Sequence, residues 1–192
     1  MIASAAAREH LFTFEEYVRI AEHSPTRLEF WDGVILDMAG GTPRHSAICN
    51  NIGHIVGGQL RGRPCRAYDA NLNVRSSVVN RATFADATIV CGALQLDPTD
   101  RTGQTVLNPS LLIEVHSPST EADDCGPKLD CYKTIASVKA VVLVSQDERR
   151  IAVHEHQPDG RWSETVHVDG MVELRAIGCT LPLDEAYEDL PE

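Results

Sequence analysis

The stretch from Leu111 to Lys133 holds the residues whose types and spacing are best suited to chemistry. Glu114 lies inside an apolar run with the composition of a strand buried on both faces, where an ionised carboxylate is costly without a cation or hydrogen-bond donors. A polar break follows, and Asp124 as N-cap with Pro127 in the first turn predicts a helix. Lys128 on that helix would lie beside the end of the strand, so the sequence predicts a cation within reach of Glu114.

Two further acids can join Glu114. Asp86 lies among apolar and small neighbours in the segment Thr83 to Val90, which we expect to form a mostly buried strand. Glu29 lies on the first strand of a hairpin predicted by the Asp32-Gly33 turn, and its pattern alone fits either a solvated edge carboxylate or a third acid of the site. Such carboxylates bind Mg²⁺ or Mn²⁺, hard cations that prefer oxygen ligands, and a nearby lysine can orient a water or stabilise a developing phosphorane charge.

Helices and strands that would position these acids alternate along the chain. A capping box at Thr13–Glu16 predicts a short helix, and Thr42-Pro43 begins a second one with a buried aliphatic face. Further strands are expected at 65–68, 72–75, 140–144, 151–156, 161–166 and 171–174, with a surface loop at 92–108 and an acidic, partly structured tail from Thr180. This pattern predicts an α/β fold: a mixed sheet flanked by helices, with C-terminal antiparallel strands.

Composition bounds the class of protein. A chain of 192 residues with 43% hydrophobic content predicts one globular domain, 1–192, and no apolar run approaches the roughly 20 residues of a membrane span. The net charge of −11 has the wrong sign for coating nucleic acid, although a local basic groove or a bound metal can offset it. The six cysteines are scattered, with no CxxC pair and no secretory leader, so we expect reduced thiols and a cytoplasmic protein.

Histidines outside this group receive no role from the sequence. His45 and His54 on the second helix are typical of surface or hydrogen-bonded core histidines. His154 and His156 alternate on one strand face, but neither a third ligand nearby nor a cysteine pair completes a tetrahedral zinc set. Arg61, Arg63 and Arg66 are explained by the helix dipole, although they also form the best local basic patch.

Five motifs together resemble the Uma2 (DUF820) family of the PD-(D/E)XK nuclease superfamily. They are Arg27-Leu28-Glu29-Phe30-Trp31-Asp32-Gly33, Arg44-His45, Phe84-Ala85-Asp86, Leu112-Ile113-Glu114-Val115-His116-Ser117-Pro118-Ser119-Thr120, and Asp124 through Lys128-Leu129 to Tyr132. The resemblance extends from Phe12 to about Leu183, and the E-V-x-S-P-S-T stretch followed by D-x-x-x-K-L-x-x-Y is its specific part. It implies a restriction-endonuclease-like fold with a core of about 12–183.

The resemblance also implies roles for individual residues. Asp86 and Glu114 would be ligands of Mg²⁺ or Mn²⁺ with the Val115 carbonyl as a third, Lys128 would be the catalytic cation, and Glu29 would contribute to the metal site or the water. Two positions depart from the superfamily pattern: the proline before the aspartate is Ala85, and the lysine two residues after the glutamate is His116. Lys128 must then substitute from the helix, because a neutral histidine matches neither the charge nor the reach of lysine.

The function that these roles imply is an endonuclease that hydrolyses DNA phosphodiester bonds by a Mg²⁺-activated water, and that pairs as a homodimer. A rival is a non-catalytic binding or regulatory module that retains the fold. Hydrolysis of a smaller phosphodiester is a third reading, which a chromogenic diester would reveal and a plasmid-nicking assay would miss.

Overall fold

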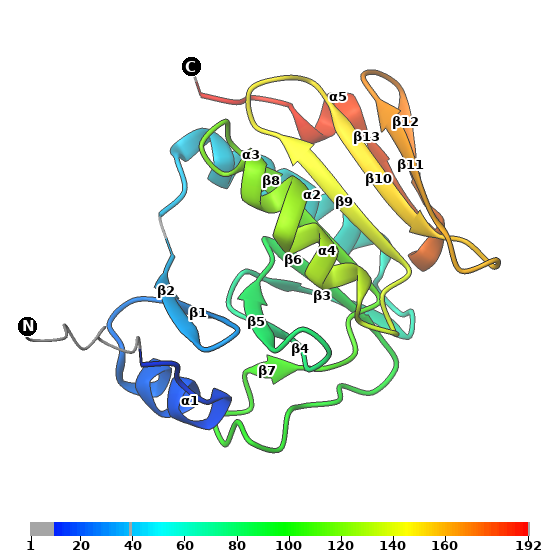
Figure 1. Cartoon of the computed structure of the whole chain (residues 1–192). Coiled ribbons are helices and arrows are strands. Elements are labelled where there is room, and N and C mark those ends of the chain that lie inside the picture. The colour runs from blue at the N-terminus through cyan, green and yellow to red at the C-terminus, as the bar shows by residue number, and fades with distance from the viewer. Residues whose placement is uncertain (1–9, 39, 192) are drawn as a thin grey trace, which may run out of the picture.

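The computed structural model describes residues 10–38 and 40–191, which form a mixed α/β fold around a six-stranded sheet (Figure 1). The strand order is β11-β10-β9-β8-β6-β3. The strands are β3 (Cys65–Asp69), β6 (Ala87–Cys91), β8 (Leu111–His116), β9 (Ala140–Ser145), β10 (Ile151–His156) and β11 (Trp162–His167). Only β8 and β9 run parallel among these neighbours, so the predicted mixed α/β class is confirmed.

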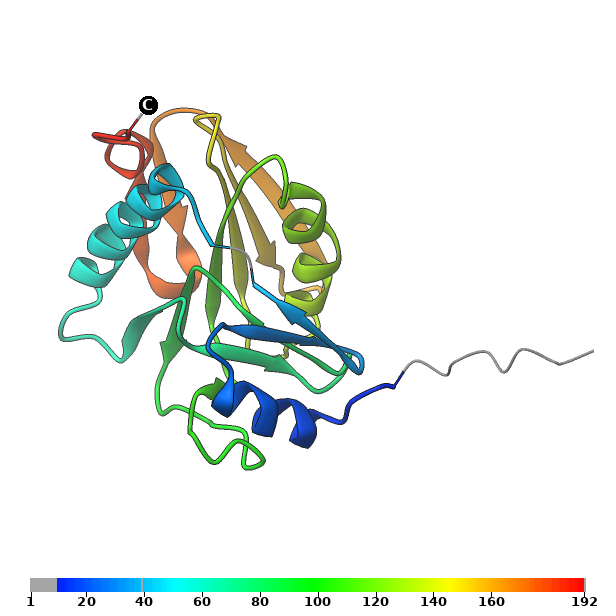
Figure 2. The ribbon, with the colours of Figure 1, turned by 90° about the vertical axis from the view of Figure 1, so that its left-hand side faces the viewer.

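The two faces of this sheet are covered by different helices. Helix α2 (Pro43–Gln59) packs on one face, and the segment formed by α3 (Glu121–Asp123), η1 (Asp124–Lys128) and α4 (Leu129–Lys133) packs on the other (Figure 2). Side chains of β8 alternate between them: Ile113 joins the core under α2, whereas Leu112 joins the core under α4. Glu114, two residues after Leu112, therefore points to the α4 side.

A five-stranded sheet, in the order β2-β1-β5-β4-β7, stands beside the first (Figure 1). Its strands are β1 (Leu28–Trp31), β2 (Val34–Asp37), β4 (Asn73–Ser76), β5 (Arg81–Phe84) and β7 (Thr105–Val106), and α1 (Phe14–His23) packs against it. The predicted capping box at Thr13 is present. The predicted hairpin turn is present too, since Asp32 and Gly33 both adopt the positive φ angles of a type I′ turn, 48° and 94°. A short strand, β7, lies in the segment predicted as a loop, where it pairs with β4.

The single strand predicted from Thr83 to Val90 is wrong. The chain forms β5 in the smaller sheet, bends at Ala85 and Asp86, and continues as β6 in the larger sheet. The residues that flank Asp86 give no sign of the bend, because Ala85 is fully buried between the two sheets and so has the character of a strand residue. Asp86 consequently lies at the junction of the sheets rather than within a strand.

The C-terminal tail is more ordered than the sequence predicted. Strands β12 (Met171–Leu174) and β13 (Cys179–Pro182) pair with each other, the short helix η2 (Arg175–Ile177) joins them, and α5 (Leu183–Ala186) follows. The acidic residues of this segment are exposed, but Leu181, Leu183 and Ala186 are fully buried in the core beneath α2. Within residues 10–38 and 40–191, no helix has the length and apolarity to cross a membrane.

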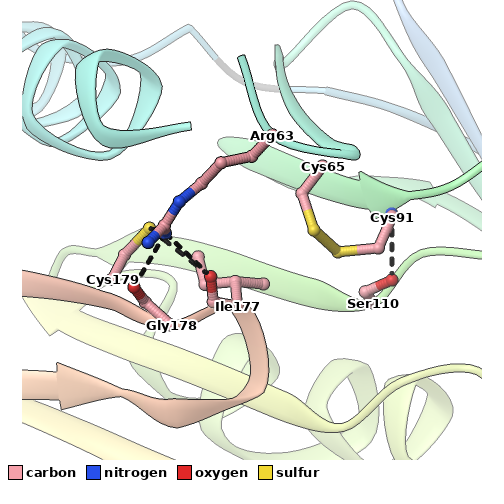
Figure 3. Close-up of a disulfide and its surroundings, with 7 residues drawn as sticks. All are labelled: Arg63, Cys65, Cys91, Ser110, Ile177, Gly178 and Cys179. Carbon is pink, nitrogen blue, oxygen red and sulfur yellow. Dashed lines mark hydrogen bonds between the residues drawn. A yellow bond between two sulfur atoms is a disulfide. The ribbon is translucent and has the colours of Figure 1, made fainter. Parts of the chain in front are cut away.

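A disulfide joins Cys65 and Cys91 (Figure 3), so the expectation that all six cysteines are thiols is wrong for this pair. The two residues are register partners on the antiparallel strands β3 and β6, which the scattered spacing in sequence does not show. The Cys91 N–H also donates a hydrogen bond to Ser110 Oγ. Cys49, Cys125, Cys131 and Cys179 are free.

We predict that replacing both Cys65 and Cys91 by serine lowers the free energy of unfolding by about 3 kcal/mol, because the disulfide closes a long loop in the unfolded chain. Denaturant titration of the variant and the wild-type protein measures the difference. Thiol counting in denaturant without reductant is the direct check, with four reactive thiols expected. Six thiols before reduction would contradict the pairing.

Candidate active site

Lys128 lies in the middle of three carboxylates. Its Nζ atom is 3.1 Å from Glu114 Oε1, 3.6 Å from Glu29 Oε1 and 3.6 Å from Asp124 Oδ1. The lysine side chain is 10% exposed and the glutamate at 114 only 3%, so water screens these interactions weakly. The predicted contact between Lys128 on the helical segment and Glu114 on the strand is present. Lys128 also contacts two further acids, Glu29 and Asp124.

An interrupted helix brings Lys128 to this position. Gly126 departs from helical angles (φ −115°, ψ −109°) and Pro127 has no N–H to donate, so the segment from Asp124 to Lys128 widens into a π-type turn between α3 and α4. The prediction of Asp124 as an N-cap is wrong, because the helical segment begins at Glu121 and Asp124 lies inside it. Its carboxylate is buried and faces Lys128, four residues further along.

Glu114 is held by a tyrosine as well as by the lysine. The Tyr132 hydroxyl donates a 2.5 Å hydrogen bond to Glu114 Oε1 and accepts one from Thr83 Oγ1 at 3.1 Å. Burial, followed by the charge of Glu114, raises the pKa of Tyr132 well above its ordinary value, so the hydroxyl keeps the proton that it donates. Both donors on the carboxylate therefore engage the same oxygen, Oε1.

Burial and neighbouring charges shift the pKa values of Glu114 and Lys128 in opposite directions. Burial raises the pKa of Glu114 to about 8, although Lys128 beside it opposes the shift. Burial alone would lower the pKa of Lys128, but the neighbouring carboxylates, Glu114 foremost, outweigh it and hold that pKa above its ordinary value. Lys128 is therefore a permanent cation, and the site retains an excess of acid groups around it.

Glu29 is a partly buried member of this group. Its Oε1 accepts a hydrogen bond from the Phe84 backbone N–H at 3.1 Å, and its Oε2 accepts one from Trp31 Nε1 at 3.0 Å. The side chain is only 12% exposed. Of the two readings that the sequence left open, the solvated edge carboxylate does not fit these contacts, and the third acid does.

Asp86 approaches from the junction of the sheets. Its Oδ2 accepts a 2.7 Å hydrogen bond from the Val115 N–H and lies 3.2 Å from His45 Nε2. Strand β6 pairs with β8 in an antiparallel register that sets Ala87 opposite Ile113. Asp86 precedes Ala87 and Glu114 follows Ile113, so the same register brings Asp86 opposite Glu114. The hydrogen bond with Asp86 raises the pKa of His45, which burial opposes, and the Val115 carbonyl adds to the rise.

The donors present fit a hard divalent cation. Among the described residues, no hydrogen bond or ion pair engages Asp86 Oδ1 or Glu114 Oε2, so each carboxylate has one held oxygen and one available oxygen. The carbonyl of Val115 points to the same side as its N–H, toward Asp86, because both groups of a strand residue share one edge. Oxygen donors with excess negative charge are the ligands that Mg²⁺ and Mn²⁺ prefer.

His116 lies where the superfamily pattern has its lysine, but the structure keeps it apart from the acids. The side chain is buried, and its Nε2 has no hydrogen-bond partner among the described residues. Burial lowers the pKa of His116, which favours the neutral ring. Within that part of the chain no ion pair or hydrogen bond joins this ring to Glu114, Asp86 or Lys128.

Three residues of the site were not predicted in these positions: His45, Asp124 and Tyr132. The sequence predicts Asp124 as a helix cap, places Tyr132 only at the end of a family motif, and gives His45 no role. A signal was available for two of them, because Asp124, Lys128 and Tyr132 follow one another at four-residue spacing and must share one face of a helix. No comparable pattern joins His45 to Asp86, since the contact spans 41 residues of sequence.

Comparisons with known proteins identify the family and the fold. Residues 14–183 match the Uma2 family, which is described as "Putative restriction endonuclease". Two uncharacterised proteins of Synechocystis sp. are 30% and 23% identical over 92% and 81% of this chain, covering 91% and 87% of their own lengths. A crystal structure of a DUF820 protein from Anabaena variabilis, described as a "putative nuclease", has the same fold with a TM-score of 0.73, at 17% identity over 92% of this chain and 97% of that one. The chain belongs to the Uma2 family.

Proposed function

We propose that this protein is a divalent-metal-dependent nuclease that hydrolyses DNA phosphodiester bonds. The observation that carries the proposal is the pair of acids Glu114 and Asp86, each with an oxygen available for a cation, beside the cation Lys128 that Glu114 contacts. Membership of the Uma2 family and the shared fold with a DUF820 protein described as a putative nuclease support the same reaction class. Only the chemistry of the group, and no particular DNA sequence, follows from these features.

Asp86, Glu114 and the Val115 carbonyl would hold Mg²⁺ or Mn²⁺. When bound, such an ion supplies Lewis-acid stabilisation of a phosphate and makes water a stronger nucleophile near neutral pH. The chain prepares the oxygens for this role: the Val115 N–H fixes the Asp86 carboxylate, and Tyr132 fixes that of Glu114.

Lys128 would stabilise the charge that develops on the scissile phosphate. Its position is set by Glu29 and Asp124, which flank it at 3.6 Å and are themselves partly buried and buried, respectively. A cation held in place before the reaction needs no reorganisation when charge develops, which is the source of most electrostatic catalysis. Glu29 would thus act on the site by positioning Lys128 and the water that attacks the phosphate.

A groove provides an approach for DNA despite the net charge of −11. Its volume is about 610 Å³, and its lining includes Arg27, Arg61 and His54 together with Asp86. The arginines would offer contacts for phosphates in the groove that Asp86 lines. Because one chain contributes one such group, we propose that two chains pair as a homodimer to cut both strands, and that residues 12–183 act as one domain.

Two other functions would use the same fold. A binding or regulatory module would bind DNA or a partner without cleaving it, and a phosphodiesterase for small substrates would cleave a chromogenic diester but leave plasmid DNA intact. Incubation of wild-type protein with plasmid DNA and with the diester, each with Mg²⁺, with Mn²⁺ and with chelator, separates the three. The proposal expects metal-dependent nicking of the plasmid.

We predict that Asp86→Asn and Glu114→Gln each weaken Mn²⁺ binding by at least about tenfold, because each replaces a carboxyl group, which can bind the ion as a carboxylate, with a neutral amide. Both should abolish plasmid cleavage while the protein stays folded by circular dichroism. Calorimetry with Mn²⁺ measures the affinity. Asp130→Asn, which changes an exposed acid on α4, is the matched control. Wild-type affinity in the Glu114→Gln protein would exclude Glu114 as a ligand.

Removing Lys128 should have a different effect. In Lys128→Met we expect Mn²⁺ to bind still, and to raise the melting temperature by more than in wild-type protein, because the acids have lost their internal cation. The cleavage rate should fall on the order of 100-fold or more, since the charge on the phosphate is no longer stabilised.

His116→Gln is the control for Lys128. It changes the residue at the superfamily's lysine position while leaving the acid group untouched, so its cleavage rate should stay within a few-fold of wild type. An inactive His116→Gln protein together with an active Lys128→Met protein would reverse the assignment.

A further inference from the structure

Three side chains of types that can bind metals, His45, Cys49 and Asp86, meet in the lining of the groove. His45 Nε2 lies 3.2 Å from Asp86 Oδ2, and Cys49 Sγ lies 3.6 Å from His45 Nδ1 and 3.9 Å from His45 Nε2. One ligand atom from each of the three residues lies within 4.8 Å of the other two. All three side chains are half-buried and line the groove, so an ion from solvent has access to them.

The fold holds these side chains in place from two elements. His45 and Cys49 are four residues apart on α2 and therefore share one face of the helix. Asp86 is fixed opposite them by the Val115 N–H. Gly41 leaves the room that the imidazole occupies, since a Cβ atom there would lie 2.7 Å from His45 Nδ1.

We propose that His45, Cys49 and Asp86 form a second metal site, for a divalent ion that accepts a thiolate ligand, with Zn²⁺ as its representative. A tetrahedral zinc with bonds of about 2.0–2.1 Å to nitrogen and oxygen and about 2.3 Å to sulfur separates its ligand atoms by roughly 3.3–3.6 Å. The separations of His45 Nε2 from Asp86 Oδ2 and from Cys49 Sγ are 3.2 and 3.9 Å, and the Cys49 and Asp86 ligand atoms lie within 4.8 Å of each other, so side-chain adjustments alone can reach this arrangement. Cys49 would bind as the thiolate, releasing its proton to solvent, and the fourth position would open to the groove.

This site differs from the proposed Mg²⁺ site in its selectivity and shares one residue with it. Magnesium prefers carboxylate and carbonyl oxygens, whereas a set that includes imidazole and thiolate selects zinc over magnesium. Asp86 belongs to both donor sets, so zinc at His45 and Cys49 would draw this carboxylate away from Glu114. The inference needs no nuclease activity, because it concerns metal binding alone.

Cobalt is the probe that tests it. Co²⁺ added to reduced, metal-free wild-type protein should give an equimolar complex with a sulfur-to-cobalt charge-transfer absorption in the near ultraviolet. Zn²⁺ should abolish this absorption, and a large excess of Mg²⁺ should leave it in place. Cys49→Ser should remove the band, and His45→Ala should weaken Co²⁺ binding on the order of 100-fold.

The matched control is Cys125→Ser. His116, Glu121 and Cys125 form the other group of His, Cys and acid side chains close enough to share an ion, so cobalt bound there would also give a sulfur band. The proposal expects the Cys125→Ser band to equal that of wild type; loss of the band in this variant would overturn the assignment, as would a band that persists in Cys49→Ser.

Alkylation of Cys49 in the wild-type protein tests the same site without a substitution, so the result does not depend on a variant that folds correctly. Zn²⁺ should slow alkylation of Cys49 at least about tenfold, as read by mass spectrometry of the modified peptide, while Mg²⁺ should not. Unchanged alkylation of Cys49 at saturating Zn²⁺ would contradict the site.

Discussion

The burial of one lysine among three carboxylates is the constraint on which the rest of this site depends. Removing charged groups from water is costly. The attraction between Lys128 and Glu114 alone would offset this desolvation cost only if their geometry were favourable. The structure adds Glu29 and Asp124 to the same lysine, so the local charge is negative even with the lysine ionised. Further donors offset this cost for Glu29 and Glu114, whereas Asp124 is paired with Lys128.

The supporting donors come from parts of the chain that are distant in sequence. Trp31 and the Phe84 N–H hold Glu29, Tyr132 holds Glu114, and the Val115 N–H holds Asp86. These donors belong to both sheets and to the helix that covers one of them. The bend at Ala85 and Asp86 is what allows this, because it carries the chain from the smaller sheet to the larger one at the acids. This charge network therefore depends on the packing of the two sheets against each other.

Much of this site could be predicted from the sequence because charge in an apolar strand is conspicuous. Glu114 lies in a run of Leu, Ile and Val, where a buried carboxylate needs a cation or a hydrogen-bond donor. The four-residue spacing in the following helix indicates Lys128 as that cation. The Asp32-Gly33 turn likewise predicted the hairpin that carries Glu29, because two adjacent positive φ angles suit few residue pairs.

The remaining features depend on contacts that local pattern does not encode. The apolar and small neighbours of Asp86 conceal the change of sheet, since a residue buried between two sheets is as apolar as one buried within a strand. The pairing of Cys65 with Cys91 and the contact of His45 with Asp86 arise from strand register and helix placement. Asp124 was misassigned because an acid before a proline fits a helix cap equally well, and only the position of Lys128 distinguishes the two.

The central claim is that Asp86 and Glu114 form one cation site beside Lys128. A crystal structure of the protein grown with Mn²⁺, with anomalous diffraction to locate the ion, tests it most directly. The account predicts one anomalous peak at bonding distance, about 2.1–2.2 Å, from a carboxylate oxygen of each acid and from the Val115 carbonyl, with Lys128 still paired to Glu29. Full Mn²⁺ occupancy elsewhere, with both carboxylates free of the ion, would contradict it.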